Sequence, residues 1–206
     1  MFEYLTSGVL LGLGAGLAPG PLLVLVISET LKYNIRAGIK VSITPIITDL
    51  PIILLTLLIL SKLSNFILVL GFISIFGGFF VLYLGYESFK TKGIKIDTES
   101  VAPQSIRKGV ITNALNPHPY LFWFSVGSPF IMKSLYTNIS YAIAFILGFY
   151  LLLVSSKISL AIIVGKSRSF LEGKIYIYIM RLLGILLFIF SLLLFRDGLE
   201  FFGFLK

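Results

Sequence analysis

The sequence predicts an all-α integral membrane protein: a single membrane domain over residues 1–206, with six transmembrane helices in two inverted three-helix repeats. Composition is the first reason, because 57% of the 206 residues are hydrophobic and 13% are charged, against about 45–50% and about 25% in soluble domains. Long uncharged runs are the second, because each approaches the roughly 20 residues that a helix needs to cross the hydrocarbon core. A soluble fold of this length could not bury so much apolar surface.

The first half, residues 1–87, contains three such runs, and we expect helices at about 4–28, 38–61 and 64–86. None of the runs alternates with period two, and each is longer than the ~10 residues of a spanning strand, so helices are the better prediction. The first run is too long for the apolar region of a signal peptide and follows Glu3 rather than a basic start. We therefore expect it to remain as a helix of the mature protein.

A polar segment at 88–108 is expected to be a solvated linker between the halves. The second half, residues 109–206, is expected to form helices at about 109–132, 136–164 and 175–195. Lys157 leaves the end of the fifth helix open. It is an interfacial anchor if the helix ends near it, and an intramembrane cation if the helix continues to Val164.

Lysine and arginine are distributed unevenly between the loops, which predicts the orientation of the chain in the cell membrane. Four lie on the side of the second and fourth loops, namely Lys62, Lys133, Arg196 and Lys206. Eleven follow the first, third and fifth helices, namely Lys32, Arg36, Lys40, Lys90, Lys92, Lys95, Arg107, Lys108, Lys166, Arg168 and Lys174. By the positive-inside rule the odd loops are cytoplasmic, and both termini are outside. Three helices per half is an odd number, so a repeat would be inverted.

The two halves share a Leu-x-Pro-x-Pro pattern, at residues 17–22 (LAPGPL) and 115–120 (LNPHPY). Proline has no N–H and clashes with the carbonyl four residues back, so each pattern breaks its helix and frees carbonyls, those of Ala15, Leu17, Asn113 and Leu115. Paired breaks near the midplane point to a transport site, with a simple packing kink as the alternative. The substrate-binding residues expected at the breaks are Pro19, Gly20, Pro21, Asn116, Pro117 and His118.

Charged residues inside the runs mark further site candidates. Asp49 is in the middle of the second helix, where an ionised carboxylate costs at least ~2.5–3.5 kcal/mol. We expect it to bind a substrate ammonium or to exchange the coupling proton, with His118 as a second proton-coupling candidate. The alternatives are an Asp49 bonded to a helix end or to Arg181, and a His118 that is a hydrogen-bonded packing element. Arg181 is expected either to bind substrate or to snorkel to the interface, and an intramembrane Lys157 could contact a substrate carboxylate.

Two glycine series predict close helix packing. Gly8, Gly12, Gly16 and Gly20 repeat every four residues in the first helix, and another series repeats every seven residues in the third helix. Small residues at these spacings let another helix approach closely. The series permit a homodimer without requiring one.

Several segments together resemble the LysE-type amino-acid exporters, which include the homoserine and threonine efflux proteins. The matching pieces are residues 12–21 (GLGAGLAPGP), Gly38, Thr48-Asp49, Leu84-Gly85, Asn116-Pro117 and residues 181–184 (RLLG). The resemblance implies a six-helix secondary exporter driven by an ion gradient, with both proline motifs and Asp49 as functional positions. This sequence departs from the family where His118 replaces a usual Lys, where Pro119 adds a second proline, where Thr48 replaces a Gly, and at Lys157.

The predicted function is secondary active export of amino acids or related small solutes, coupled to a proton or ion gradient. Two alternatives stay open: export of a divalent cation or other ion, and a membrane scaffold without transport. The partners expected are the small-molecule substrate, the coupling ion and the lipid bilayer, with no nucleic acid and no cofactor. An enzyme is not expected, because an aspartyl protease needs a second intramembrane carboxylate, and Ser128 is ten residues from His118, the sole histidine. No metal site is expected, since the chain has no cysteine and a single histidine.

Overall fold

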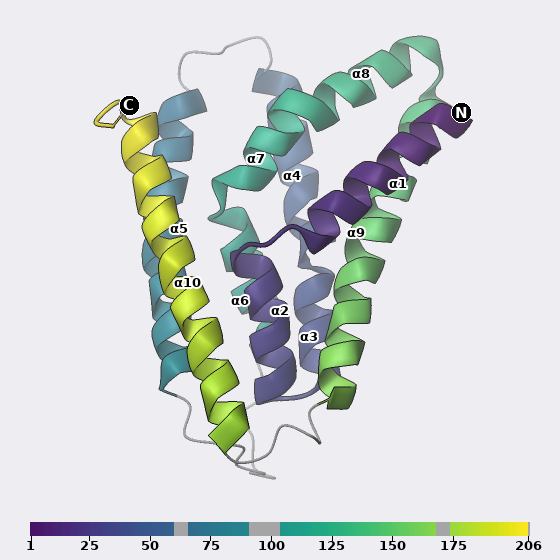
Figure 1. The fold of residues 1–206 in the computed structure, drawn as a ribbon. Coiled ribbons are helices and arrows are strands. Elements are labelled where there is room, and N and C mark those ends of the chain that lie inside the picture. Colours follow the sequence, from purple (N-terminus) through teal and green to yellow (C-terminus); the bar gives the residue numbers. More distant parts are fainter. Residues whose placement is uncertain (60–65, 91–103, 168–173, 206) are drawn as a thin grey trace.

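The computed structural model describes residues 1–59, 66–90, 104–167 and 174–205, and all regular structure in these ranges is helical (Figure 1). The helices of the first half are α1 (Phe2–Leu17), α2 (Pro21–Lys32), α3 (Ile35–Ser42), α4 (Thr44–Ile59) and α5 (Phe66–Phe89). Those of the second half are α6 (Ser105–Ala114), α7 (Pro117–Phe122), a π-helical turn (Trp123–Gly127), α8 (Ser128–Thr137), α9 (Ile139–Ser167) and α10 (Lys174–Phe201). Most of the predicted linker at 88–108 lies outside the described residues.

Four segments in the described ranges are long and apolar enough to cross a membrane: Ile35–Leu57, Gly71–Phe89, Ile139–Ser167 and Ile175–Phe201. Together, α1 and α2 form a fifth candidate that is bent by 63°. The helix predicted at 4–28 is therefore two helices. The helix predicted at 109–132 is likewise divided into α6, α7, the π-helical turn and α8, none of which reaches spanning length. The all-helical class is confirmed, while the number of six spans stays a prediction.

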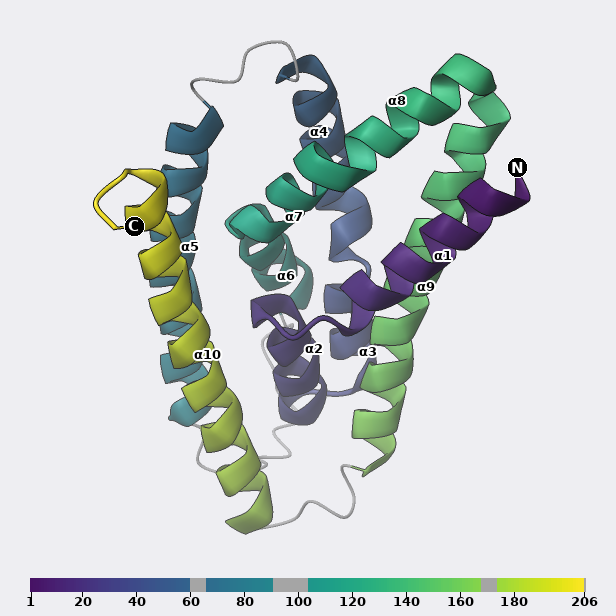
Figure 2. The ribbon, with the colours of Figure 1, turned by 45° about the horizontal axis from the view of Figure 1, so that its top comes forward.

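The helices form two long pairs with shorter helices between them, and the partners run parallel in the α1–α9 pair and antiparallel in the α5–α10 pair. In Figures 1 and 2, α1 lies along α9 on one side and α5 lies along α10 on the other, with α2, α3 and α6 between the pairs. Both termini lie at the same end of the molecule, at the top of Figure 1. We call this the terminal end, and the end that α2 and α3 approach the opposite end.

The glycine series explain why both pairs pack closely. A Cβ atom added at Gly8 would lie 2.3 Å from the carbonyl oxygen of Phe145, and one at Gly12 would lie 2.1 Å from that of Phe149. These glycines therefore let the backbones of α1 and α9 touch. On α5, the glycines repeating every seven residues face aromatic rings repeating every seven residues on α10, in the pairs Gly71 with Phe202, Gly78 with Phe195 and Gly85 with Phe188.

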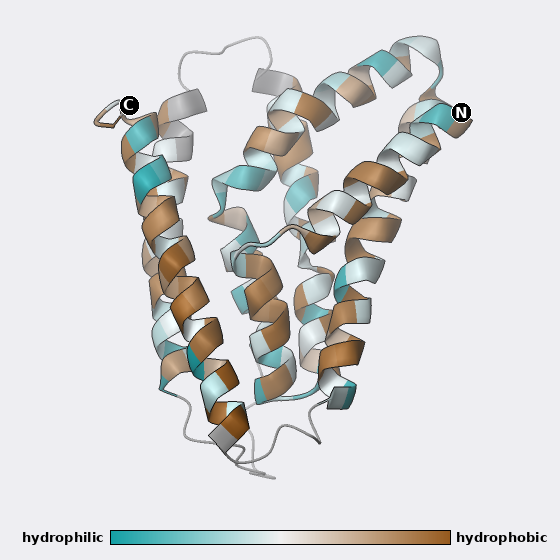
Figure 3. Cartoon of the chain, in the orientation of Figure 1, coloured by the Kyte–Doolittle hydropathy of each residue, from teal (hydrophilic) through white to brown (hydrophobic). Residues whose placement is uncertain are grey.

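The outer surface is apolar, as a lipid environment requires. Figure 3 shows that α9 and α10 are hydrophobic along most of their length. Large aliphatic side chains on these helices are exposed, among them Leu147, Leu151 and Leu192. Without water around them, such side chains cost no hydrophobic free energy, so the pattern is that of a membrane protein rather than a soluble one.

Candidate functional site

The first break separates α1 from α2 at residues 18–20. Pro19 cannot donate a hydrogen bond to the carbonyl of Ala15, and Pro21 occupies the first position of α2, where its missing N–H costs nothing. Because α1 ends at Leu17, the carbonyl groups in its last turn have no backbone N–H partners within the helix. The break therefore ends one helix, starts another and leaves backbone acceptors at its centre.

The second break separates α6 from α7, and side chains form hydrogen bonds with some of its backbone groups. The side chain of Asn116 caps α7 by accepting a 3.1 Å hydrogen bond from the backbone N–H of His118. The Tyr120 hydroxyl donates a 2.9 Å hydrogen bond to the carbonyl of Ala114. Gly77 on α5 allows the turn to pack closely, since a Cβ there would lie 1.8 Å from the carbonyl oxygen of Leu115.

A cavity of about 470 Å³ lies between the two breaks. Both breaks line it, as do α4 and α9, so segments far apart in the sequence enclose one space. The predicted site residues in its lining are Pro19, Gly20, Asp49, Asn116, His118 and Lys157. Pro21 and Pro117 are buried next to it without lining it.

Asp49 lies in this cavity and is only 4% exposed. Its Oδ1 accepts a 2.9 Å hydrogen bond from Nδ2 of Asn113, and its Oδ2 is 3.4 Å from the Tyr150 hydroxyl. The indole N–H of Trp123 faces the carboxylate but forms no regular hydrogen bond with any described residue. In the described part of the chain no lysine, arginine or histidine forms an ion pair with Asp49. Neutral donors thus surround a carboxylate that a cationic solute could still bind.

The sequence did not predict that Asn113, Tyr150 and Trp123 surround Asp49. Asn113 also donates to Thr48, at 2.6 Å, and so joins α6 to α4. It is one helical turn before Asn116 (i, i+3), so its position on the same face was a usable signal. Tyr150 is seven residues before Lys157 on α9, which likewise places both on one face. Trp123, the only tryptophan, had no signal to say whether it faces lipid or cavity.

Of the two alternatives for Lys157, an interfacial anchor and an intramembrane cation, the structure favours the intramembrane cation. The helix α9 continues for ten residues beyond it, about 15 Å at roughly 1.5 Å per residue, and Lys157 is 4% exposed. Its Nζ donates a 2.7 Å hydrogen bond to the carbonyl of Gly16 and a 3.5 Å one to that of Ala15. The ammonium therefore lies at the C-terminal, electronegative end of α1. The carbonyl of Ala15 is one of those that the proline pattern predicts to be free.

His118 lines the exposed side of the cavity, whereas Arg181 lies apart from it. The side chain of His118 is 68% exposed, with Nε2 3.9 Å from Oδ2 of Asp197 on α10. Arg181 is exposed and its guanidinium lies 5.8 Å from the ring centroid of Phe89. The structure thus does not bring Arg181 to the cavity or to Asp49, because its position near the start of α10 places it beside the end of α5.

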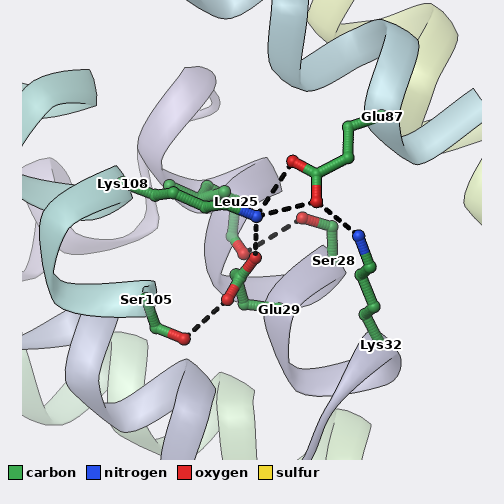
Figure 4. Close-up of polar contacts among 7 residues, drawn as sticks. All are labelled: Leu25, Ser28, Glu29, Lys32, Glu87, Ser105 and Lys108. Atoms are coloured by element: carbon green, nitrogen blue, oxygen red, sulfur yellow. Dashed lines mark hydrogen bonds and ion pairs between the residues drawn. The ribbon is translucent and has the colours of Figure 1, made fainter. Parts of the chain in front are cut away.

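A second polar cluster lies between the cavity and the opposite end, and the sequence did not reveal it (Figure 4). Glu29 of α2 is 2% exposed and accepts hydrogen bonds from Ser105 at 2.6 Å and from Lys108 at 3.0 Å. Lys108 also lies 2.9 Å from both carboxylate oxygens of Glu87 on α5, which pairs with Lys32 as well. We call these five residues the Glu29–Lys108 cluster. It ties α2, α5 and α6 together, whereas the sequence showed its charged members only as boundaries of apolar runs.

Comparison with known proteins adds one finding. The chain matches the family model described as LysE type translocator over residues 14–198. The matched region contains both breaks, the cavity lining and the Glu29–Lys108 cluster. No curated protein matches the chain, and no solved structure does.

Proposed function

Because the chain belongs to the LysE type translocator family, we propose that it is a secondary active exporter of amino acids or related small solutes, coupled to a proton or ion gradient. The observation that carries the proposal is the cavity between the two helix breaks, with buried Asp49 in its lining. Buried ionisable groups are costly in a membrane and mark solute and ion pathways. Broken helices that meet at one depth are the usual frame of such a pathway.

The cavity suits a small zwitterion or amine. Its volume of about 470 Å³ is within the roughly 300–1,000 Å³ of small-molecule sites. Asp49 supplies a carboxylate for a solute ammonium. The side-chain amide of Asn116 supplies a donor near which a solute carboxylate would bind, and Lys157 lines the same space. Asp49 and His118 are the groups first expected to exchange a coupling proton, and Arg181 has no part in this arrangement.

Transport then requires the cavity to open to each side in turn. Four lining residues are exposed, and they belong to the breaks, α7 and the π-helical turn: Ala18, Pro19, His118 and Ser125. The lining residues of α4, α6 and α9 are buried. Toward the opposite end, the Glu29–Lys108 cluster joins α2, α5 and α6. We propose that this cluster closes the cytoplasmic entrance, and that a solute enters when its ion pairs separate and the halves rock.

Counterflow in proteoliposomes tests the proposal. Labelled lysine, threonine, leucine and glutamate represent basic, hydroxylated, apolar and acidic amino acids, and each is offered separately to the unmodified protein, Asp49→Asn and Glu3→Gln. The last is a matched control, because Glu3 is an exposed carboxylate far from the cavity. We expect exchange of at least one amino acid, lost in Asp49→Asn and kept in Glu3→Gln.

Two results would contradict the proposal. Exchange that is equally fast in Asp49→Asn would remove Asp49 from the site. The second result is folded protein that exchanges none of the four amino acids. Transport of a divalent cation by that protein would favour the ion-exporter alternative, and no transport of either kind would favour a scaffold.

A further inference from the structure

We propose that Lys157 carries the coupling proton, and that its ammonium fills the place where a metal cation would otherwise bind at the break in α1. The inference rests on the proposed function and deepens it by naming the coupling ion and the group that holds it. Its evidence begins with a contact that does not involve Asp49: a buried amine, contributed by α9, is directed at the freed carbonyls of another helix.

The first step concerns those carbonyls. In unbroken helix, the carbonyl of Ala15 would accept from residue 19 and that of Gly16 from residue 20. Residue 19 is a proline, and residue 20 lies beyond the end of α1 at Leu17. Both oxygens are therefore free acceptors at the negative end of a helix, which is the arrangement that coordinates coupling cations in transporters with broken helices. Here Lys157 Nζ occupies it.

The second step concerns how the amine gets there. Gly16 has no side chain, and a Cβ at that position would lie 2.0 Å from Oγ of Ser156, the neighbour of Lys157. The glycine thus sets the close approach of α9 that brings Nζ within 2.7 Å of the Gly16 carbonyl. The same side chain lines the cavity. Lys157 is therefore in contact with both the helix break and the solute space.

The third step concerns the charges around Lys157. Asp49 on α4 is the charged group that faces it across the cavity. The cavity-lining residues of α1 and α2 are uncharged, and the cations of α3 and α8, namely Arg36, Lys40 and Lys133, are exposed. No described carboxylate forms a direct ion pair with Lys157. The attraction of Asp49 across the cavity, together with the two carbonyls, is what holds the positive charge.

The fourth step is the exchange itself. A solute ammonium that binds Asp49 neutralises this attraction and brings a second positive charge into the cavity. One proton then leaves Lys157 Nζ for cavity water, and Nζ keeps the electron pair as a neutral amine. Release of the solute on the far side restores the attraction, and Nζ takes one proton from water there. Solute and proton therefore cross in opposite directions, one proton for each ammonium.

A tethered amine can gain or lose a proton but cannot leave the site, so the coupling should depend on pH and not on alkali metal ions. In proteoliposomes that show counterflow of a labelled amino acid, we expect a pH gradient to drive its accumulation and a Na⁺ gradient at equal pH to drive none. Accumulation driven by Na⁺ in the unmodified protein would overturn the inference. Absence of counterflow for every amino acid would instead overturn the proposed function.

Lys157→Arg separates the charge from the proton, because arginine stays protonated in proteins. We expect the ratio of pH-driven accumulation to counterflow at equal pH to fall at least about tenfold in this variant. An unchanged ratio would overturn the inference. As a check that needs no variant, the amino acid that shows counterflow is added to unmodified purified protein in weakly buffered solution. We expect about one proton released per solute bound, and binding without proton release would also overturn it.

Discussion

The side-chain amide of Asn113 donates a 2.9 Å hydrogen bond to Oδ1 of Asp49, and so connects the first helix of the second half to the carboxylate of the first half. The same amide donates to Thr48. A buried carboxylate depends on such donors, because nothing else replaces the water it has lost. This contact is therefore one of the direct links between the two halves at the site, together with those from Asn113 to Thr48 and from Lys157 to Gly16.

We expect Asn113→Ala to lower counterflow and to destabilise the protein by about 1–3 kcal/mol, since it leaves an oxygen of buried Asp49 without its best donor. Thermal unfolding in detergent and counterflow together measure both effects. Gln104→Ala is the control, because Gln104 is an exposed amide that does not line the cavity and makes no capping hydrogen bond. Unchanged exchange in Asn113→Ala would show that this bond does not support the site.

The Glu29–Lys108 cluster gives a prediction about access. The chain contains no cysteine, so a single cysteine can report accessibility. Thr112 is buried on α6 one turn above Lys108, between the cluster and the cavity. We expect Thr112→Cys to resist a membrane-impermeant maleimide applied from the opposite end, and to react about tenfold faster or more when Lys108→Met is added, since a buried ion pair that loses one partner is strongly weakened.

Ser167→Cys is the control for that experiment, because Ser167 is exposed at the opposite end, where α9 ends, and should react at the same rate with or without Lys108→Met. Equal protection of Thr112→Cys in both backgrounds would mean that the cluster does not close this entrance.

Two glycines on α1 provide a matched pair for packing. A methyl group at Gly12 would lie 2.1 Å from the Phe149 carbonyl, whereas nothing lies within 4 Å of one at Gly14. Gly12→Ala should therefore push α1 from α9 and lower the unfolding temperature. Gly14→Ala should leave it unchanged or raise it, because alanine favours helix by up to about 1 kcal/mol. The reverse order in a thermal scan would contradict the observed α1–α9 contact.

His118→Gln tests which group carries the proton. The imidazole is mostly exposed and its nearest acidic partner is on α10 rather than in the cavity. With Lys157 as the proton carrier, pH-driven accumulation should persist in this variant. Loss of that accumulation with normal counterflow at equal pH would assign the proton to His118.

Fusions to the two termini test the orientation of the chain. Both termini lie at one end of the molecule, and the lysine and arginine distribution predicts that this end is outside the cell. Reporter domains fused to each terminus should both read as extracytoplasmic. A cytoplasmic reading for both would reverse the proposed direction of entry while leaving the cavity as described.

Sequence patterns predicted well where along the chain the helices are interrupted. The helical membrane class and the family are confirmed, and both proline patterns lie at helix breaks that line the cavity. These features are local, since a proline interrupts its own helix whatever surrounds it. The place of Asp49 in the middle of an apolar run is local in the same sense.

What the sequence could not supply was the rotation of each helix and its neighbours. Lys157 contacts Gly16, 141 residues away, and Lys108 contacts Glu29, 79 residues away. Nothing near either residue in the chain indicates these contacts. Arg181 shows the converse: its depth fitted a role at the site, but its helix faces α5 instead.

The packing of α5 against α10 has a consequence for how the molecule divides its work. Neither helix contributes a residue to the cavity lining, and their glycines and phenylalanine rings interlock at seven-residue intervals. The pair thus joins one helix of the first half to one helix of the second half outside the cavity. Glu87 is the one residue of the pair in the Glu29–Lys108 cluster, so the pair meets the proposed entrance there. Substitutions in the cavity lining should therefore change solute choice without altering this scaffold.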